Sequence, residues 1–163
     1  MRGVDVKPKM PRAIAVSAAV VLSALALLHV VWTRSPWPLS TRQEFLETLI
    51  GSEDVGRHPT LAMTLVVAGL LLAAAWVLLA RVALLPWWLP VWMLRWGPHV
   101  IASVLLLRGV GGLIASGLLH LSTRAFEYWD IRLYSPLSLA LGAAAVLVGI
   151  HPVLLPMYRR QEG

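Results

Sequence analysis

The chain of 163 residues is 58% hydrophobic and only 13% charged, so its polar side chains are too few to cover a soluble globule of this size. An integral membrane protein is therefore predicted. The absence of cysteine excludes disulfides, thiolate catalysis and Cys-ligated zinc or iron–sulfur centres. The formal net charge of +6 does not indicate a nucleic-acid partner, because the basic residues gather at the ends of apolar segments, as membrane orientation requires.

Four apolar segments are each long enough to cross a bilayer as a helix, which needs about 20 residues at a rise of 1.5 Å. They cover residues 13–32, 60–80, 99–119 and 135–155. Basic residues before the first segment also suit a secretory signal. However, its apolar run is longer than the roughly 7–15 residues of such a signal, and no small-residue cleavage site follows it. We expect an all-α, polytopic four-helix bundle that forms one domain over residues 1–163.

The distribution of Lys and Arg predicts the orientation of the spans. One side of the membrane would carry eight of them: Arg2, Lys7, Lys9, Arg12, Arg81, Arg95, Arg159 and Arg160. The other side would carry five: Arg34, Arg42, Arg57, Arg124 and Arg132. Because cytoplasmic loops are enriched in basic residues, both termini are predicted in the cytoplasm, with the first and third loops outside. Twelve of the fourteen basic residues are arginine, which indicates a GC-rich bacterial genome and therefore the bacterial cytoplasmic membrane.

The first loop, residues 33–59, contains a predicted short helix over residues 40–51. Thr41 and Glu44 match a capping box, and Gly51 suits the end of a helix. Four apolar residues fall on one face: Phe45, Leu46, Leu49 and Ile50. Two interpretations stay open, an interfacial helix without further role or a lid that folds over the bundle.

Tryptophans mark the second loop, where Trp88, Trp92 and Trp96 recur every four residues and would form one stripe on a helix. An aromatic cage for a quaternary amine is one interpretation of this stripe. Anchoring at the level of the lipid headgroups is the simpler one, because tryptophan is enriched at both membrane interfaces.

Small residues recur at intervals of three or four in the spans, which lets membrane helices approach one another closely. In the first span the predicted stripe is Ala15, Ala19, Leu22, Ala26 and His29. In the second span it is Ala62, Gly69, Ala73, Trp76 and Ala80. In the fourth span it is Ser138, Gly142, Ala145 and Gly149. These stripes predict a compact bundle.

The third span contains a charge, Arg108, which is followed at once by Gly109, Gly111 and Gly112. An arginine at the centre of a bilayer costs roughly 2.5–3.5 kcal/mol on insertion scales, so such residues usually face a bundle interior and meet a partner. We place Arg108 on one helix face with Gly111, Gly112 and Ala115, where the glycines leave space beside the guanidinium.

The third loop, residues 122–134, contains two candidate counter-charges. Glu127 and Asp130 stand three residues apart and would share a face if the loop is helical. Ser135 suits the N-cap of the fourth span and Pro136 its first helical position, so the span is predicted to begin there.

Arg108 would lie roughly 15 Å from the cytoplasmic start of its helix, and its long side chain can rise toward the outer side. There it could meet Asp130, Glu127 or His29. In a structural hypothesis, a buried Arg108–Asp130 pair pins the third loop onto the bundle, and His29 bonds a backbone carbonyl. In a functional hypothesis, the pair lines a cavity where Arg108 and Gly112 bind an anionic or carbonyl oxygen. Asp130 or Glu127 would then act as acid, base or cation stabiliser, while His29 relays protons. Aromatic side chains would form the walls: Trp32, Trp129 and Tyr134.

The chain also resembles one bacterial family over nearly its whole length. The shared features are His29 and Trp32, the Trp37-Pro38-Leu39 turn, Arg108-Gly109 with Gly111-Gly112, and the residues Phe126, Trp129, Asp130, Leu133, Tyr134, Ser135, Pro136 and Leu137. The family consists of small four-helix membrane proteins, common in actinobacteria and catalogued as a domain of unknown function. The resemblance implies a fold and a compartment, and it implies no activity.

Other classes have little support in the sequence. Small four-helix multidrug exporters rely on an acidic residue in the first helix, and residues 13–32 contain none. The five histidines are scattered without the spacing of metal ligands, so neither a metal nor a cofactor is expected: His29, His58, His99, His120 and His151. No glycine-rich phosphate loop follows a predicted strand.

The sequence therefore favours a protein that binds a membrane lipid or another hydrophobic small molecule in an outward-facing pocket around Arg108 and Asp130. An intramembrane enzyme acting on an isoprenoid or related lipid is one alternative. A structural or accessory membrane subunit is the other, and no feature identifies a protein partner.

Overall fold

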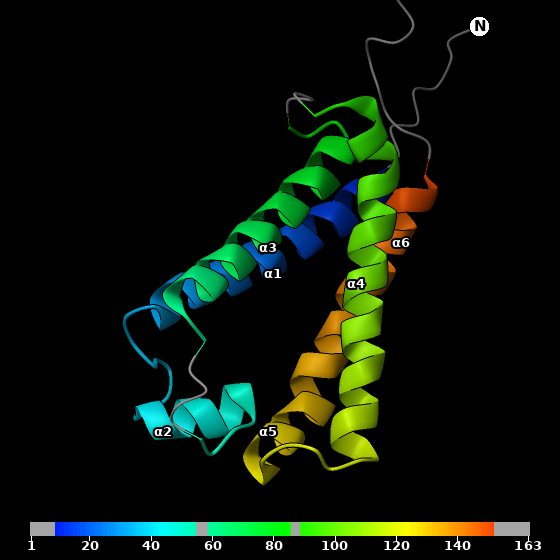
Figure 1. Ribbon diagram of the computed structural model, residues 1–163. Coiled ribbons are helices and arrows are strands. Elements are labelled where there is room, and N and C mark those ends of the chain that lie inside the picture. Colours follow the sequence, from blue (N-terminus) through cyan, green and yellow to red (C-terminus); the bar gives the residue numbers. More distant parts are fainter. Residues whose placement is uncertain (1–8, 55–58, 86–88, 152–163) are drawn as a thin grey trace, which may run out of the picture.

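The computed structural model describes residues 9–54, 59–85 and 89–151. Four long helices form most of it (Figure 1). They are α1 (Lys9–Trp32), α3 (Leu61–Arg81), α4 (Val91–Gly117) and a continuous helical segment made of α5 (Arg124–Trp129), η3 (Asp130–Tyr134) and α6 (Ser135–Ile150). Each is long and apolar enough to cross a membrane, the last one over Arg124–Ile150. The prediction of an all-α, multi-pass bundle is therefore confirmed.

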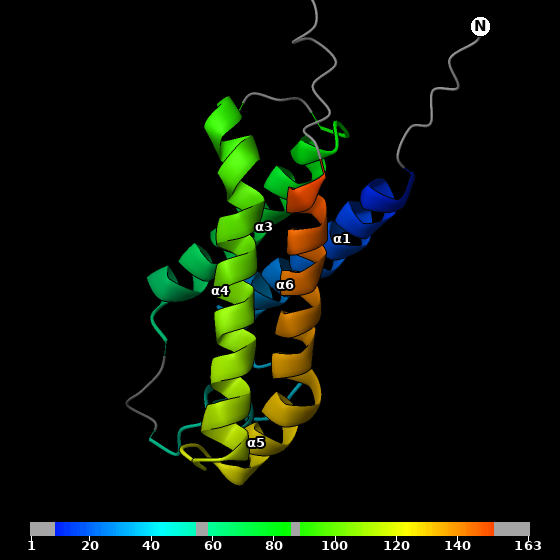
Figure 2. The same ribbon diagram turned by 90° about the vertical axis from the view of Figure 1, so that its right-hand side faces the viewer.

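The helices pack as two antiparallel pairs, α1 with α3 and α4 with α6. The pairs meet at the end of the molecule where the described chain begins and finishes. They diverge toward the opposite end, which carries α5 and the first-loop helices (Figures 1 and 2). We call these the terminal end and the loop end.

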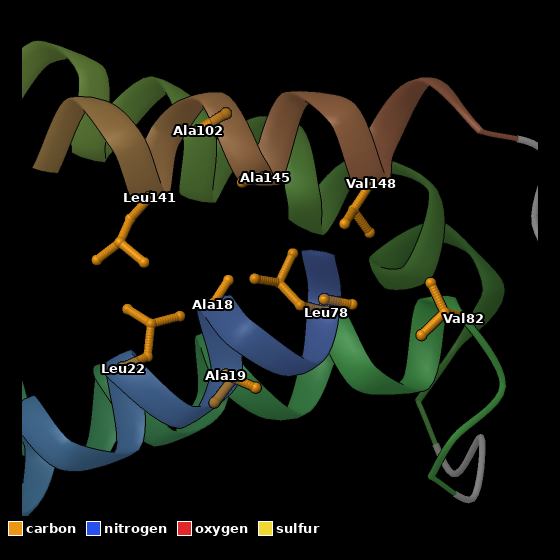
Figure 3. Packing of buried hydrophobic residues seen from close by; sticks show 11 residues of the cluster. Ala18, Ala19, Leu22, Leu78, Val82, Ala102, Leu141, Ala145 and Val148 are labelled. Atoms are coloured by element: carbon orange, nitrogen blue, oxygen red, sulfur yellow. The ribbon is translucent and has the colours of Figure 1, made fainter. Parts of the chain in front are cut away.

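Small and medium apolar residues form the core where the pairs meet, and Figure 3 shows Ala18 and Leu22 of α1 opposite Leu141 and Ala145 of α6. The side chains of this cluster are almost wholly buried. Alanines at these positions let the helix axes approach, which compensates for the lack of a hydrophobic driving force in lipid.

The predicted stripes of small residues are correct for two helices and wrong for one. In α1 the stripe residues Ala15, Ala19, Leu22 and Ala26 are buried, and in α6 Gly142, Ala145 and Gly149 are buried. In α3 most of the predicted stripe faces outward, Trp76 included, and the buried residues are Ala68, Ala75, Val77, Leu78, Ala80 and Arg81. Several faces of α3 are equally apolar, so periodicity could not select the packed one.

Two span boundaries also differ from prediction. The third span begins at Val91 instead of residue 99, and its Pro98 lies inside the helix. The fourth begins at Arg124 instead of residue 135, so Ser135 is a residue of a continuous helix and does not cap one. In both cases a proline, Pro98 or Pro136, stands next to the predicted boundary. A membrane helix tolerates proline where another group satisfies the freed carbonyl.

At Pro98, that group is the guanidinium of Arg81. Because proline has no N–H, the carbonyl of Leu94 has no helical donor, and Arg81 Nη1 donates to it at 3.0 Å. Arg81 Nη2 donates to the carbonyls of Gly149 and His151, 2.8 Å and 2.7 Å away, where α6 ends. Arg81 was predicted to be a loop charge, but it is the last residue of α3 and is buried. One side chain therefore joins α3, α4 and α6.

In the first loop, the Thr41 half of the predicted capping box and the helix end at Gly51 are confirmed, while the Glu44 carboxylate bonds one residue before the cap. The Thr41 hydroxyl accepts from Glu44 N, and the Glu44 carboxylate accepts from Ser40 N at 2.9 Å. The helix consists of α2 (Arg42–Phe45) and the π-helical turn η1 (Leu46–Ile50), and it ends at Gly51 with φ +74°. We call residues 42–50 the strap.

The strap contacts both helix pairs at the loop end. The Phe45 ring packs edge-on against Trp32 at the end of α1, with centroids 5.6 Å apart. The Thr123 hydroxyl, before α5, donates to the Glu47 carbonyl of the strap. The buried Phe45 and Leu46 side chains therefore belong to a segment that joins the two diverging pairs, rather than to a helix that lies apart on the membrane surface.

Trp92 and Trp96 lie in the first turns of α4 and are exposed, as interfacial anchors would be. Trp88, the third member of the predicted stripe, lies outside the described residues.

Replacing Arg81 by Met should lower the free energy of unfolding by about 3 kcal/mol, because three carbonyls lose a charged donor within the bundle. Thermal melting of the purified protein in detergent, followed by size-exclusion chromatography, measures this change. Arg95→Met is the matched control, since Arg95 is an exposed arginine on α4. Equal melting temperatures for the two variants would contradict the clamping role of Arg81.

Candidate functional site

The site is a cluster of four polar side chains on α4, η3 and the start of α6. Arg108 Nη2 lies 2.9 Å from Asp130 Oδ1, and Ser116 Oγ donates to Asp130 Oδ2 at 2.7 Å. Arg108 Nη1 is 3.4 Å from Ser135 Oγ. Of the three candidate partners of Arg108, the structure therefore joins it to Asp130.

The two members of the ion pair differ in exposure. The side chain of Asp130 is 0% exposed, whereas that of Arg108 is 43% exposed. Ser116 and Ser135 are completely buried beside the carboxylate. The anion is thus enclosed by its donors, and the cation has a free side.

A π-helical turn brings Asp130 and Ser135 to the same face. In an α-helix, residues five apart point about 140° away from each other. Ser135 N donates to the carbonyl of Asp130, five residues earlier, which is the hydrogen bond of a π-helix rather than of an α-helix. The next residue, Pro136, has no N–H and donates no hydrogen bond to this turn. One extra residue in this turn therefore aligns Asp130 and Ser135 toward α4.

Glycine at position 112 leaves the room that the cluster occupies. A Cβ there would lie 2.8 Å from Asp130 Oδ2 and would collide with Arg108 and Ser135. A Cβ at Gly111 would meet nothing within 4 Å, and Gly111 is exposed. Of the predicted face, Gly112 is confirmed beside Arg108 and Gly111 is wrong, because Gly111 points outward.

Glu127 and His29 have other partners. The Glu127 carboxylate is 3.1 Å from His120 Nδ1 and accepts from Ser122 N at 3.4 Å, so it closes the turn after α4. His29 Nδ1 lies 2.8 Å from the carbonyl of Leu25, as the structural hypothesis expected. Each of these contacts is local to its own loop or helix.

The three predicted wall residues have separate surroundings. Trp32 donates from Nε1 to the Trp37 carbonyl at 2.8 Å. The Tyr134 hydroxyl is 3.4 Å from the carbonyl of Thr48 in the strap. Trp129 is exposed and packs edge-on against Tyr128. Trp32 and Tyr134 therefore hold the strap from the two helix pairs, and Trp129 faces outward.

Two members of the site, Ser116 and Ser135, were missed as ligands of the carboxylate. The spacing of Ser116 contained the signal, because it stands eight residues after Arg108 and four after Gly112 on one helix face. Ser135 was assigned to a helix cap, and only the π-helical turn reveals that it faces Asp130.

Arg108 lies on a row of α4 whose earlier residues pack against the core. Ile101 and Leu105, seven and three residues earlier, pack against the core shared by the pairs. Arg108 continues this row toward the loop end, where the pairs diverge (Figure 1). It stands nine residues before Gly117, the end of α4, which corresponds to about 14 Å along the helix.

A pocket of about 420 Å³ also opens between the first and third loops. It is lined by Gly51, Ser52, Glu53, Asp54, Leu121, Ser122 and Thr123. None of the predicted site residues lines it, so it is separate from the ion pair.

Four candidate membrane spans around a polar cluster define a polytopic α-helical membrane protein. A family model described as "Protein of unknown function (DUF3995)" matches residues 12–145, and the chain belongs to this family. The matched range contains both Arg108 and Asp130. The resemblance to an uncharacterised four-helix membrane family is thereby confirmed, and a search of curated proteins and of solved structures found no match.

Gly112→Ala should destabilise the protein by about 1–3 kcal/mol, because the added methyl group displaces the ion pair from a packed site. Gly111→Ala should have no such effect, since nothing lies within 4 Å of the added atom. Melting temperatures of both variants in the same detergent test this difference. An equal loss of stability in the two variants would contradict the inference that Gly112 makes room for the ion pair.

Proposed function

We propose that this protein binds a lipid-like small molecule between its two helix pairs, with the polar group of that molecule held by Arg108. The observation that supports the proposal most is the unequal exposure of the ion pair. A charged side chain within a span is costly unless a polar group meets it. Asp130 meets one side of the guanidinium, and a bound ligand would meet the exposed side.

The arrangement of the helices supports access from the membrane. The pairs are tied at the terminal end by the alanine-rich core and Arg81, and at the loop end by the strap. Along α4, Arg108 lies between these two ties, on the row of Ile101 and Leu105, which pack against the core. A molecule entering sideways from the bilayer would reach it with a polar group while its apolar chain stays in lipid.

The contacts of the two carboxylates favour binding over acid–base catalysis. Both oxygens of Asp130 are engaged, by Arg108 and Ser116, and the Glu127 carboxylate is held by His120. A general base must reach the proton that it abstracts, and a carboxylate enclosed by its own donors is not available for this. We therefore prefer lipid binding to the alternative of an enzyme that acts on an isoprenoid.

The binding proposal is tested by mass spectrometry of lipids that co-purify with the protein in a mild detergent. A lipid enriched with the wild type should be lost from Arg108→Leu and strongly reduced in Arg108→Lys, which keeps the charge but not the planar donor array. Arg132→Leu is the matched control, because Arg132 stacks on Tyr128 at 3.9 Å and lies outside the cluster.

All variants are compared only where they elute as a single species. The same lipids in the wild type, Arg108→Lys and Arg132→Leu would overturn the proposal and favour a purely structural ion pair.

We further propose that the membrane is the bacterial cytoplasmic membrane, that the host is an arginine-rich bacterium such as an actinobacterium, and that both termini are cytoplasmic. The bias of basic residues toward the terminal end supports this orientation. Arg81 is buried and so leaves the count of solvated charges, which changes from eight against five to seven against five. The loop end would then face outward.

Single introduced cysteines test this orientation cleanly, because the natural chain has none. In intact cells, a membrane-impermeant maleimide should label Glu53→Cys, whose position at the loop end is exposed. It should label Arg95→Cys, near the terminal end, only after the cells are permeabilised. The reverse pattern would show that the termini face outward.

A further inference from the structure

The ion pair leaves only hydrogen-bond donors for a ligand. An arginine side chain has five N–H donors and no acceptor. Among the described residues, Nη2 donates to Asp130 at 2.9 Å and Nη1 lies 3.4 Å from Ser135 Oγ. Both oxygens of Asp130 are already accepting, from Arg108 and from Ser116. A ligand at the exposed side of Arg108 therefore has to supply an acceptor.

The Arg108–Asp130 pair also has no net charge that could attract a charged ligand. The carboxylate of Asp130 already neutralises the guanidinium, and no other ion pair to Arg108 occurs within the described part of the chain. A phosphate would bring an unbalanced negative charge into the span. It would compete with Asp130 for the same cation, and a displaced Asp130 would remain as a wholly buried carboxylate without its counter-charge, which is strongly unfavourable.

An uncharged oxygen avoids both costs. A carbonyl oxygen can accept from the N–H groups of Arg108 that remain, without displacing Asp130 and without adding charge. On this basis we infer that the ligand is a neutral lipid that presents a carbonyl oxygen to Arg108, and not an anionic lipid that presents a phosphate. The inference rests on the proposed function and specifies its ligand class.

Two kinds of neutral lipid carry this oxygen, acylglycerol esters and isoprenoid quinones. The depth of the pair does not distinguish between them, since residue 108 stands about 14 Å along the helix from the end of α4 and its long side chain can reach toward the interface. The experiment below therefore includes one lipid of each kind.

The test measures binding of three defined lipids to the delipidated full-length protein in detergent, by native mass spectrometry and by quenching of tryptophan fluorescence. Dioleoylglycerol and dioleoyl phosphatidate differ only in the phosphate, and a polyprenyl quinone is the third probe. Dioleoylglycerol, the quinone or both should bind about tenfold more tightly than phosphatidate or better, a ratio set by the cost of the unbalanced charge. The dioleoylglycerol and quinone results identify which source of the carbonyl the site accepts.

The variant Asp130→Asn tests the charge argument directly. The amide oxygen keeps an acceptor for Arg108, and the amide nitrogen can donate to the Ser116 hydroxyl. The cluster becomes positively charged, so the preference should move toward phosphatidate. Arg132→Leu is the control and should keep the preference of the wild type. The comparison of dioleoylglycerol with phosphatidate on the wild type stands by itself if Asp130→Asn does not fold.

The failure modes of the two proposals are distinct. Tighter binding of phosphatidate than of both neutral lipids to the wild type would overturn the neutral-carbonyl inference and leave lipid binding at Arg108 standing. If none of the three lipids binds and co-purified lipids are the same with and without Arg108, both proposals are wrong.

Discussion

A carboxylate without access to water has to be balanced inside the protein, and at Asp130 this requirement organises the loop end of the molecule. Its charge is met by Arg108 and its second oxygen by Ser116, both from α4. Meeting these donors needs a π-helical turn at the start of the fourth span and a glycine at position 112. This ion pair, together with the Ser116 hydrogen bond, thus attaches the third-loop segment to α4.

Polar groups in a span must find partners within the protein, and this constraint also explains the contacts of Arg81 at the terminal end. There a proline leaves the Leu94 carbonyl without a helical donor, and the buried Arg81 donates to it and to the carbonyls of Gly149 and His151 at the end of α6. The two arginines differ in one respect. Arg81 is enclosed and serves the fold, whereas Arg108 retains an exposed side and so is the one that a ligand can reach.

The division into two helix pairs accounts for the different exposure of Arg81 and Arg108. Alanines allow close contact at the terminal end, and the pairs separate toward the loop end, where the strap spans between Trp32 and Tyr134. A rigid closed end and a bridged open end suit a protein that receives a molecule from the surrounding bilayer. The proposed neutral carbonyl ligand follows from the charge balance of the pair within this arrangement.

Composition and periodicity alone were sufficient to predict the class of protein, the number of spans and the helix start at Thr41. They also identified Arg108 and Asp130 as the candidate pair. Apolar length and an isolated charge are local properties of a chain, which is why these predictions needed no tertiary structure. Only the tertiary structure decided which face of α3 is buried, since its faces are equally apolar. It also decided that Arg81 is a clamp, that Glu127 belongs to His120, and that Ser116 completes the site. These depend on which carbonyls, carboxylates and hydroxyls from distant segments come into contact inside the bundle. Spacing alone could place Ser116 on the helix face of Arg108, but it could not show which carboxylate that face would contact.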